Sequence, residues 1–145
     1  MGCKVTMSLV SERQDGPIGD DWKYEVHAKV FNEGLKGKGL IKVAKHTLPE
    51  GSTMDPHGAP EPVVMDGGEC GGTVLVRVVV NATEVDLFIS DKGTSSLDIT
   101  LKSPGPGEAP ITKDTEVSVG VRESPGISGE TSIFRVMIRL VAECV

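Results

Sequence analysis

Ionisable side chains able to bind a metal gather in one stretch of the chain, PEGSTMDPHGAPEPVVMDGGECGG, at residues 49–72. The weak candidates for ligands are Asp55, His57, Glu61, Asp66 and Glu69. Carboxylates in a loop favour calcium over zinc. The spacing, however, matches neither an EF-hand loop nor a pair of zinc-binding histidines. We therefore expect solvated side chains and no cofactor, with a calcium site on these residues as the alternative.

The same stretch offers residues for an enzyme that depends on a metal or a thiol, namely Asp55, His57 and Cys70. Cys70 stands between two Gly-Gly pairs, where its thiol would be exposed. The nucleophile-elbow pattern GxSxG and the zinc pattern HExxH are both missing from the sequence. We expect a non-enzymatic binding module, and the enzyme stays the alternative.

Lysines are concentrated between residues 22 and 48, where six Lys and two Glu give a charge of +4. Because the whole chain carries −6, the remainder carries −10. The segment GLKGKG at 34–39 resembles a nucleotide loop but fits neither the GxGxxG nor the Walker pattern, so we expect a hairpin turn. We predict a binding surface that combines this lysine-rich hairpin with the 49–72 loop, and its candidate residues are Lys36, Lys38, Lys42, Lys45 and His57. Protection of a sheet edge by lysines is the alternative.

The amino terminus carries a motif for lipidation. Met1-Gly2-Cys3-Lys4-Val5-Thr6 fits M-G-x-x-x-[ST], with Gly2 as the myristate acceptor and Cys3 suited to palmitate. Two acyl chains, or one chain and a basic patch, hold a protein on a membrane stably. A membrane-tethered adaptor acylated at Gly2 and Cys3 is therefore a further alternative.

Composition excludes other classes. Aromatic residues make up 3% of the chain and its net charge is −6, so a nucleic-acid binder is not expected. No apolar run approaches the roughly 20 residues of a membrane helix, and no secretory signal is visible. Three cysteines without a CxxC pair predict reduced thiols in the cytoplasm, with a Cys3–Cys144 bridge as the alternative.

The elements that must position these residues are strands. Apolar and polar residues alternate with period 2 in eight segments, separated by Gly, Pro, Asn and Asp. These segments begin at or near Val5, Trp22, Leu40, Thr73, Val85, Leu97, Val117 and Ile133. This pattern predicts one domain over 1–145, an antiparallel β-sandwich of the immunoglobulin-like or a related Greek-key kind. A β-barrel is the alternative. Loops are expected at 49–72 and 103–114.

Two segments, WKYEVHAKVFNE at 22–33 and ATEVDLFISDKGTSSLDITL at 82–101, are similar to strands of the calpain-like β-sandwich in small acylated kinetoplastid proteins. The resemblance implies a sandwich, and no functional residue is transferred from it. Taken together, the sequence predicts a module that recognises a protein partner, a larger assembly or an anionic membrane surface through its loops.

Overall fold

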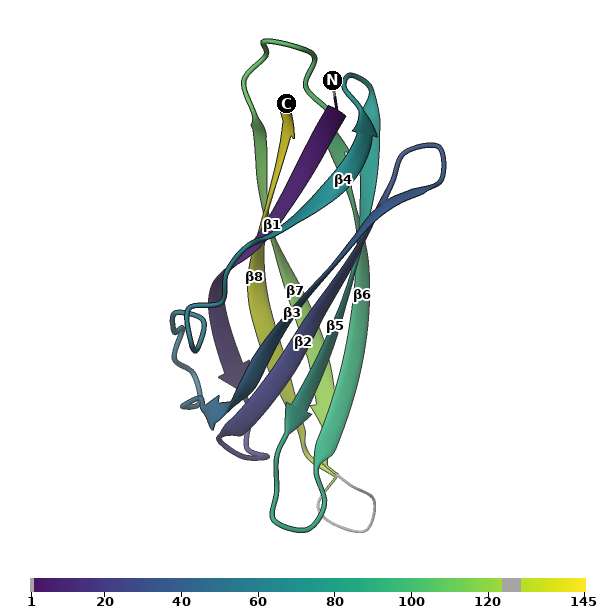
Figure 1. The fold of residues 1–145 in the computed structure, drawn as a ribbon. Helices are drawn as coiled ribbons and strands as arrows, with labels where there is room; N and C mark the ends of the chain where they lie inside the picture. The colour runs from purple at the N-terminus through teal and green to yellow at the C-terminus, as the bar shows by residue number, and fades with distance from the viewer. Residues whose placement is uncertain (1, 124–128) are drawn as a thin grey trace.

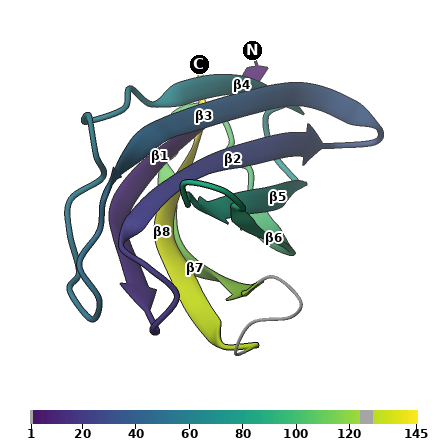
Figure 2. The same cartoon turned by 90° about the horizontal axis from the view of Figure 1, so that it is seen from below.

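The computed structural model describes residues 2–123 and 129–145, which form two antiparallel four-stranded sheets packed face to face (Figures 1 and 2). The strands are β1 (Gly2–Asp15), β2 (Asp21–Phe31), β3 (Leu35–Thr47), β4 (Val63–Glu69), β5 (Thr73–Glu84), β6 (Asp91–Lys102), β7 (Ile111–Arg122) and β8 (Thr131–Cys144). Their orders are β4-β1-β8-β7 and β3-β2-β5-β6. The predicted sandwich is confirmed. The barrel alternative is wrong, because the two sheets are not closed on each other.

Alternation along the strands builds the core. In β2, the side chains from Trp22 to Val30 at every second position are buried, while Lys23 and Lys29 face solvent. Strand β8 contributes Phe134, whose ring centroid lies 5.7 Å from that of Trp22 and 4.7 Å from that of Tyr24. Burying such aromatic and β-branched side chains between the sheets is the main force that holds a sandwich together.

Of the three glycines in the predicted hairpin turn at 34–39, Gly34 lies in a turn, whereas Gly37 and Gly39 lie inside β3. The turn is at Asn32–Gly34, where the amide of Asn32 donates to the carbonyl of Gly34. A Cβ on Gly37 would lie 2.6 Å from the carbonyl oxygen of Asp66 in β4. The glycines therefore allow β3 of one sheet to pack directly on β4 of the other.

Two further predictions about strands are corrected. The 49–72 segment is not a single loop, because Val63–Glu69 forms β4 and pairs with β1. The segment predicted as a strand through Val85, Leu87 and Ile89 is a loop between β5 and β6, since the pairing of those strands ends at Glu84 and Asp91. The 103–114 loop is shorter than predicted, because β7 begins at Ile111.

The expectation of reduced thiols is wrong for two of the three cysteines. Cys70 and Cys144 form a disulfide, with their Cα atoms 5.5 Å apart. This bond links the residue after β4 to the last residue of β8 and spans β1, which lies between those strands. Cys3 faces Cys144 across β1 and β8, but its thiol is free and buried, so the Cys3–Cys144 bridge is also wrong. Disulfides persist in oxidising compartments, and the cytoplasmic location stays a prediction.

Candidate functional site

An apolar loop tip protrudes from the end of the sandwich opposite the two chain termini (Figure 1). Leu87 and Phe88 in this β5–β6 loop are 95% and 96% exposed, and Ile89 is 58% exposed. Three consecutive large apolar side chains in water carry a free-energy cost that a folded domain ordinarily avoids. We define Leu87, Phe88 and Ile89 as the apolar tip. Exposed apolar patches of this kind are typical of surfaces that contact a protein partner or a membrane.

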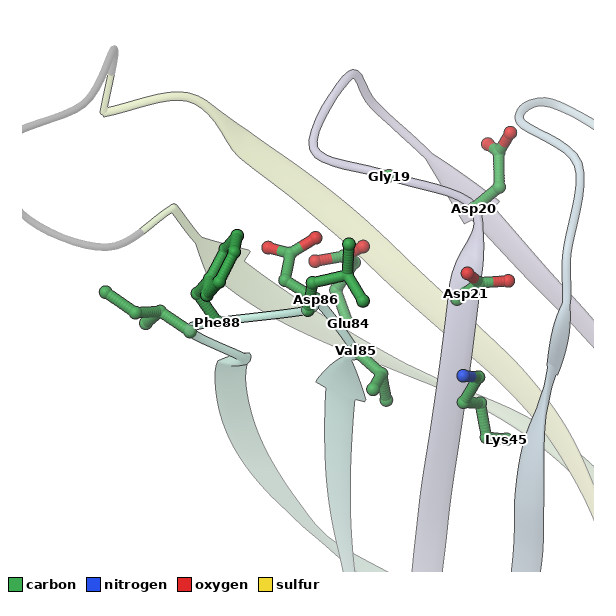
Figure 3. A pocket seen from close by; sticks show the side chains of 10 residues that line it. Gly19, Asp20, Asp21, Lys45, Glu84, Val85, Asp86 and Phe88 are labelled. Carbon is green, nitrogen blue, oxygen red and sulfur yellow. The ribbon is translucent and has the colours of Figure 1, made fainter.

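Carboxylates converge at the base of the apolar tip. Glu84 ends β5, Asp91 begins β6 opposite it, and Asp86 lies between them in the loop. One carboxylate oxygen from each of the three lies within 4.8 Å of the others. Figure 3 shows the side chains of Glu84 and Asp86 next to each other, with Asp21 on the neighbouring β2 strand. We call Glu84, Asp86 and Asp91 the acidic cluster.

Glu84 is the most constrained member of the acidic cluster. It is 2% exposed, and its Oε2 atom has no hydrogen-bond partner among the described residues. The turn between β1 and β2 covers it closely, since a Cβ on Gly19 would lie 2.0 Å from Glu84 Oε1. Burial, followed by the hydrogen bond and the charge of Asp86 and the charges of Asp91 and Asp21, raises the pKa of Glu84 to about 8. The carboxyl group therefore keeps its proton in the fold at neutral pH.

A consequence is that the protein should lose stability as the pH rises from about 5 to about 8. The folded state holds a proton on Glu84 up to a pKa of about 8, whereas the unfolded chain releases it near 4.5. Between these values the folded state binds more protons, so the free energy of unfolding falls with rising pH, by up to about 1.4 kcal/mol per pH unit. The charged groups that surround this carboxyl are Asp20, Asp21, Lys45, Asp86 and Asp91.

Urea unfolding followed by the fluorescence of the single Trp22 measures this slope across the pH range. Glu84→Gln should remove most of the fall and make the protein more stable than the wild type at pH 8.5. The matched variant Asp98→Asn, on the exposed face of β6 beside Arg77, should keep the wild-type slope. A wild-type slope retained in Glu84→Gln would contradict this assignment.

Lysines lie beside the same end of the molecule. Lys23, Thr83 and Lys92 occupy one row across β2, β5 and β6, next to the row that contains Glu84 and Asp91. Lys42 lines the same surface hollow as Lys23 and Lys92, and Lys45 lines the hollow that contains the apolar tip. We define Lys23, Lys42, Lys45 and Lys92 as the lysine group.

The predicted binding lysines are thereby divided into two sets. Lys42 and Lys45 belong to the lysine group, whereas Lys36 and Lys38 lie in the first residues of β3. Lys38 pairs with Lys29, and Lys36 lines a hollow with Asp66 and Glu69 on the side of the chain termini. The predicted lysine surface is thus two separate patches.

His57 is exposed in the 49–62 segment, but its backbone joins a polar network centred on the buried Glu12. Its backbone N–H donates to Glu12 Oε1 at 3.0 Å, and its ring stacks on that of His46 with centroids 4.3 Å apart. Glu12 is 1% exposed and also accepts from the Tyr24 hydroxyl at 2.7 Å and from His46 Nε2. The pKa of Tyr24 is raised, first by burial and then by the hydrogen bond to Glu12 and its charge. The network holds the 49–62 segment against β1, where Met54 also pairs with Glu12.

The other predicted metal ligands are spread apart. Asp55 and Glu61 are exposed in the 49–62 segment, whereas Asp66 and Glu69 lie on β4. Asp66 Oδ1 accepts from the amide of Gly68. Among the described residues, the acidic cluster is the one group of three potential ligands, and it includes none of the five predicted residues. Cys70, the thiol of the enzymatic alternative, is bound in the disulfide.

The proposed acylation sites lie within the sheet. The amide of Gly2 donates to the carbonyl of Val145 at 3.0 Å, and Cys3 is 1% exposed. Palmitate on Cys3 would require β1 to leave its place between β4 and β8. Acylation of these residues stays a prediction. In the part of the chain that the structure describes, no helix has the length and apolarity to cross a membrane.

The apolar tip and the acidic cluster were missed by the sequence analysis. Val85, Leu87 and Ile89 are apolar at every second position, which is the pattern of a half-buried strand. The sequence analysis therefore predicted a strand where the structure has a loop. The signal that could have revealed it is the uninterrupted run Leu87-Phe88-Ile89 after an acidic residue. The protein is thus an antiparallel sandwich with a loop at one end that carries the apolar tip and has the acidic cluster at its base. Comparisons with protein-family models, curated proteins and solved structures found no match.

Proposed function

We propose that this protein is a non-enzymatic binding module that docks on an anionic lipid surface through the apolar tip and the lysine group. The observation that carries the proposal is the near-complete exposure of Leu87 and Phe88 at the end of a hairpin. A protruding apolar tip suits a fluid medium that closes around it, as the boundary between lipid headgroups and acyl chains does. A flat apolar patch would suit a protein partner better.

The lysine group supplies the second contribution. Lys23, Lys42 and Lys92 line one hollow on the outer face of the β3-β2-β5-β6 sheet, next to the row that ends in the acidic cluster. Each lysine near an anionic surface contributes about 1 kcal/mol of attraction at physiological salt. Insertion of the tip would place these ammonium groups at headgroup level, so apolar burial and charge attraction would act together.

The β5–β6 loop that carries the apolar tip lies at the end of the sandwich opposite the amino terminus (Figure 1). Docking through the loop therefore needs no lipid anchor at the amino terminus. A protein partner or a larger assembly, also expected from the sequence, would be the occupant of the same tip if vesicles fail to bind.

The test is co-sedimentation of the full chain with vesicles of phosphatidylcholine, with and without phosphatidylserine. We expect binding that increases with phosphatidylserine and decreases with added salt. The double variant Leu87→Ser/Phe88→Ser should weaken the partition coefficient by about tenfold or more, because two large apolar side chains no longer leave water. The matched control is Val64→Ser, which removes another side chain that is 60% exposed, on β4.

Equal sedimentation of the double variant and the wild type would remove the apolar tip from the proposal. No sedimentation of the wild type with either vesicle, in the presence or absence of calcium, would overturn membrane docking and leave a protein partner as the explanation for the exposed tip.

A further inference from the structure

We propose that the acidic cluster, Glu84, Asp86 and Asp91, is a calcium-binding site. One oxygen from each carboxylate already lies within 4.8 Å of the other two. Calcium takes oxygen ligands at about 2.4 Å, so two ligands on opposite sides of the ion are about 4.8 Å apart. The three oxygens can thus reach one calcium ion with small side-chain adjustments. Magnesium, with ligands at about 2.1 Å, would need them closer together.

A second observation points to a ligand at this place. Glu84 Oε2 is buried and has no hydrogen-bond partner among the described residues. A buried carboxylate oxygen without a donor is costly, and native structures ordinarily satisfy such atoms. A bound cation would supply the missing partner.

Calcium should also stabilise the fold, because the ion binds the folded chain, in which the three carboxylates lie together, in preference to the unfolded chain.

The ligand set selects the kind of ion. All three side chains offer oxygen, which suits hard cations such as calcium, and neither a thiol nor an imidazole takes part. Water and backbone carbonyl oxygens ordinarily complete the six to eight ligands of calcium. Lys45 lines the same hollow, and its positive charge would repel a cation that enters the hollow (Figure 3).

Calcium would also affect the apolar tip. The acidic cluster lies at the base of the loop that carries Leu87 and Phe88, where its charge repels anionic headgroups. Neutralisation by calcium would lower this repulsion and tie both ends of the loop together. This consequence rests on the proposed membrane docking, whereas the calcium site itself does not.

Terbium luminescence tests the site directly, because the ion replaces calcium and emits when excited through a nearby Trp. Trp22, the one Trp of the chain, pairs with Glu84 across β2 and β5. We expect sensitised emission that excess calcium abolishes and magnesium reduces less. Asp86→Asn, at an exposed loop position, should weaken terbium binding by about tenfold or more. Asp98→Asn, elsewhere on β6, should leave it unchanged.

Two results would overturn the site. One is emission in Asp86→Asn equal to that in Asp98→Asn, and the other is terbium emission that calcium does not displace. Chemical unfolding adds an independent readout, since calcium should raise the unfolding midpoint of the wild type and of Asp98→Asn but not that of Asp86→Asn.

The failures of the two proposals are distinguishable. Calcium binding is measured without lipid, and the Leu87→Ser/Phe88→Ser variant should bind terbium like the wild type. If calcium binds but does not increase sedimentation with phosphatidylserine vesicles, the site stands and its link to docking is wrong. If terbium does not bind while vesicles do, docking stands and the calcium site is wrong.

Discussion

Glu12→Ala is expected to lower the free energy of unfolding by about 3–5 kcal/mol, because a buried acceptor shared by three polar groups would be lost. The carboxylate of Glu12 lies between the sheets and accepts from the Tyr24 hydroxyl, the His57 amide and His46 Nε2. His46 Nδ1 faces the carbonyl oxygen of Ala44 at 2.7 Å. Both ring nitrogens of His46 thus face oxygen atoms, and Nε2 faces the buried carboxylate of Glu12.

Removal of Glu12 would leave the Tyr24 hydroxyl, the His57 amide and His46 Nε2 without their common partner. It would also release the 49–62 segment, because the N–H of His57 and the backbone pair of Glu12 with Met54 join that segment to β1. We therefore expect protease cleavage within residues 49–62 to become faster, in addition to the loss of stability measured by chemical unfolding.

The matched control is Glu25→Ala. Glu25 also pairs with a histidine, His27, at 3.0 Å, but both side chains are about 40% exposed. The pKa of Glu25 is lowered by its hydrogen bond with His27 and by the charge of Lys42. An exposed pair of this kind contributes about 0–1 kcal/mol. If Glu12→Ala costs no more than Glu25→Ala, the network does not hold the 49–62 segment.

Period-2 alternation was sufficient to predict most of the sandwich but not this network. In β1, Val5 and Met7 are buried at odd positions, and the expected continuation would place Glu12 in solvent. A bulge between Leu9 and Ser11 shifts the pairing with β8, so that Glu12 and Gln14 face inward instead. One extra residue in a strand turns every later side chain to the other face. Nothing in the local pattern marks where that residue is inserted.

The candidate site escaped prediction for a related reason. Alternation describes which side of an extended chain a residue occupies, but it does not show where pairing stops. The pairing of β5 and β6 stops at the pair Glu84–Asp91, so Leu87, which would be buried in a continuing strand, is exposed at the tip together with Phe88. The acidic cluster likewise depends on which strands become neighbours, since Glu84 ends β5 and Asp91 begins β6.

Loss of the Cys70–Cys144 disulfide is the second large effect that we expect, at about 4 kcal/mol. The two cysteines are 74 residues apart in the sequence, so the bond closes a long loop in the unfolded chain and removes much of its conformational freedom. Cys70→Ala/Cys144→Ala should lower the free energy of unfolding by about this amount. The matched control is Cys3→Ala, which removes the free, buried thiol without changing the chain entropy.

Reductant separates this entropic contribution from the packing of the two side chains. Unfolded without reductant, the wild type should expose one reactive thiol, that of Cys3, and three after reduction. Reduction should lower the unfolding midpoint of the wild type and of Cys3→Ala, but not that of the double variant. Three reactive thiols before reduction would show that the bond does not form.

The disulfide lies beside the chain termini, whereas the apolar tip lies at the opposite end of the sandwich (Figure 1). Terbium binding should therefore survive reduction of the disulfide wherever the protein remains folded. If reduction of the disulfide abolishes terbium binding together with the fold, the two ends of the sandwich unfold as one cooperative unit in the presence of reductant.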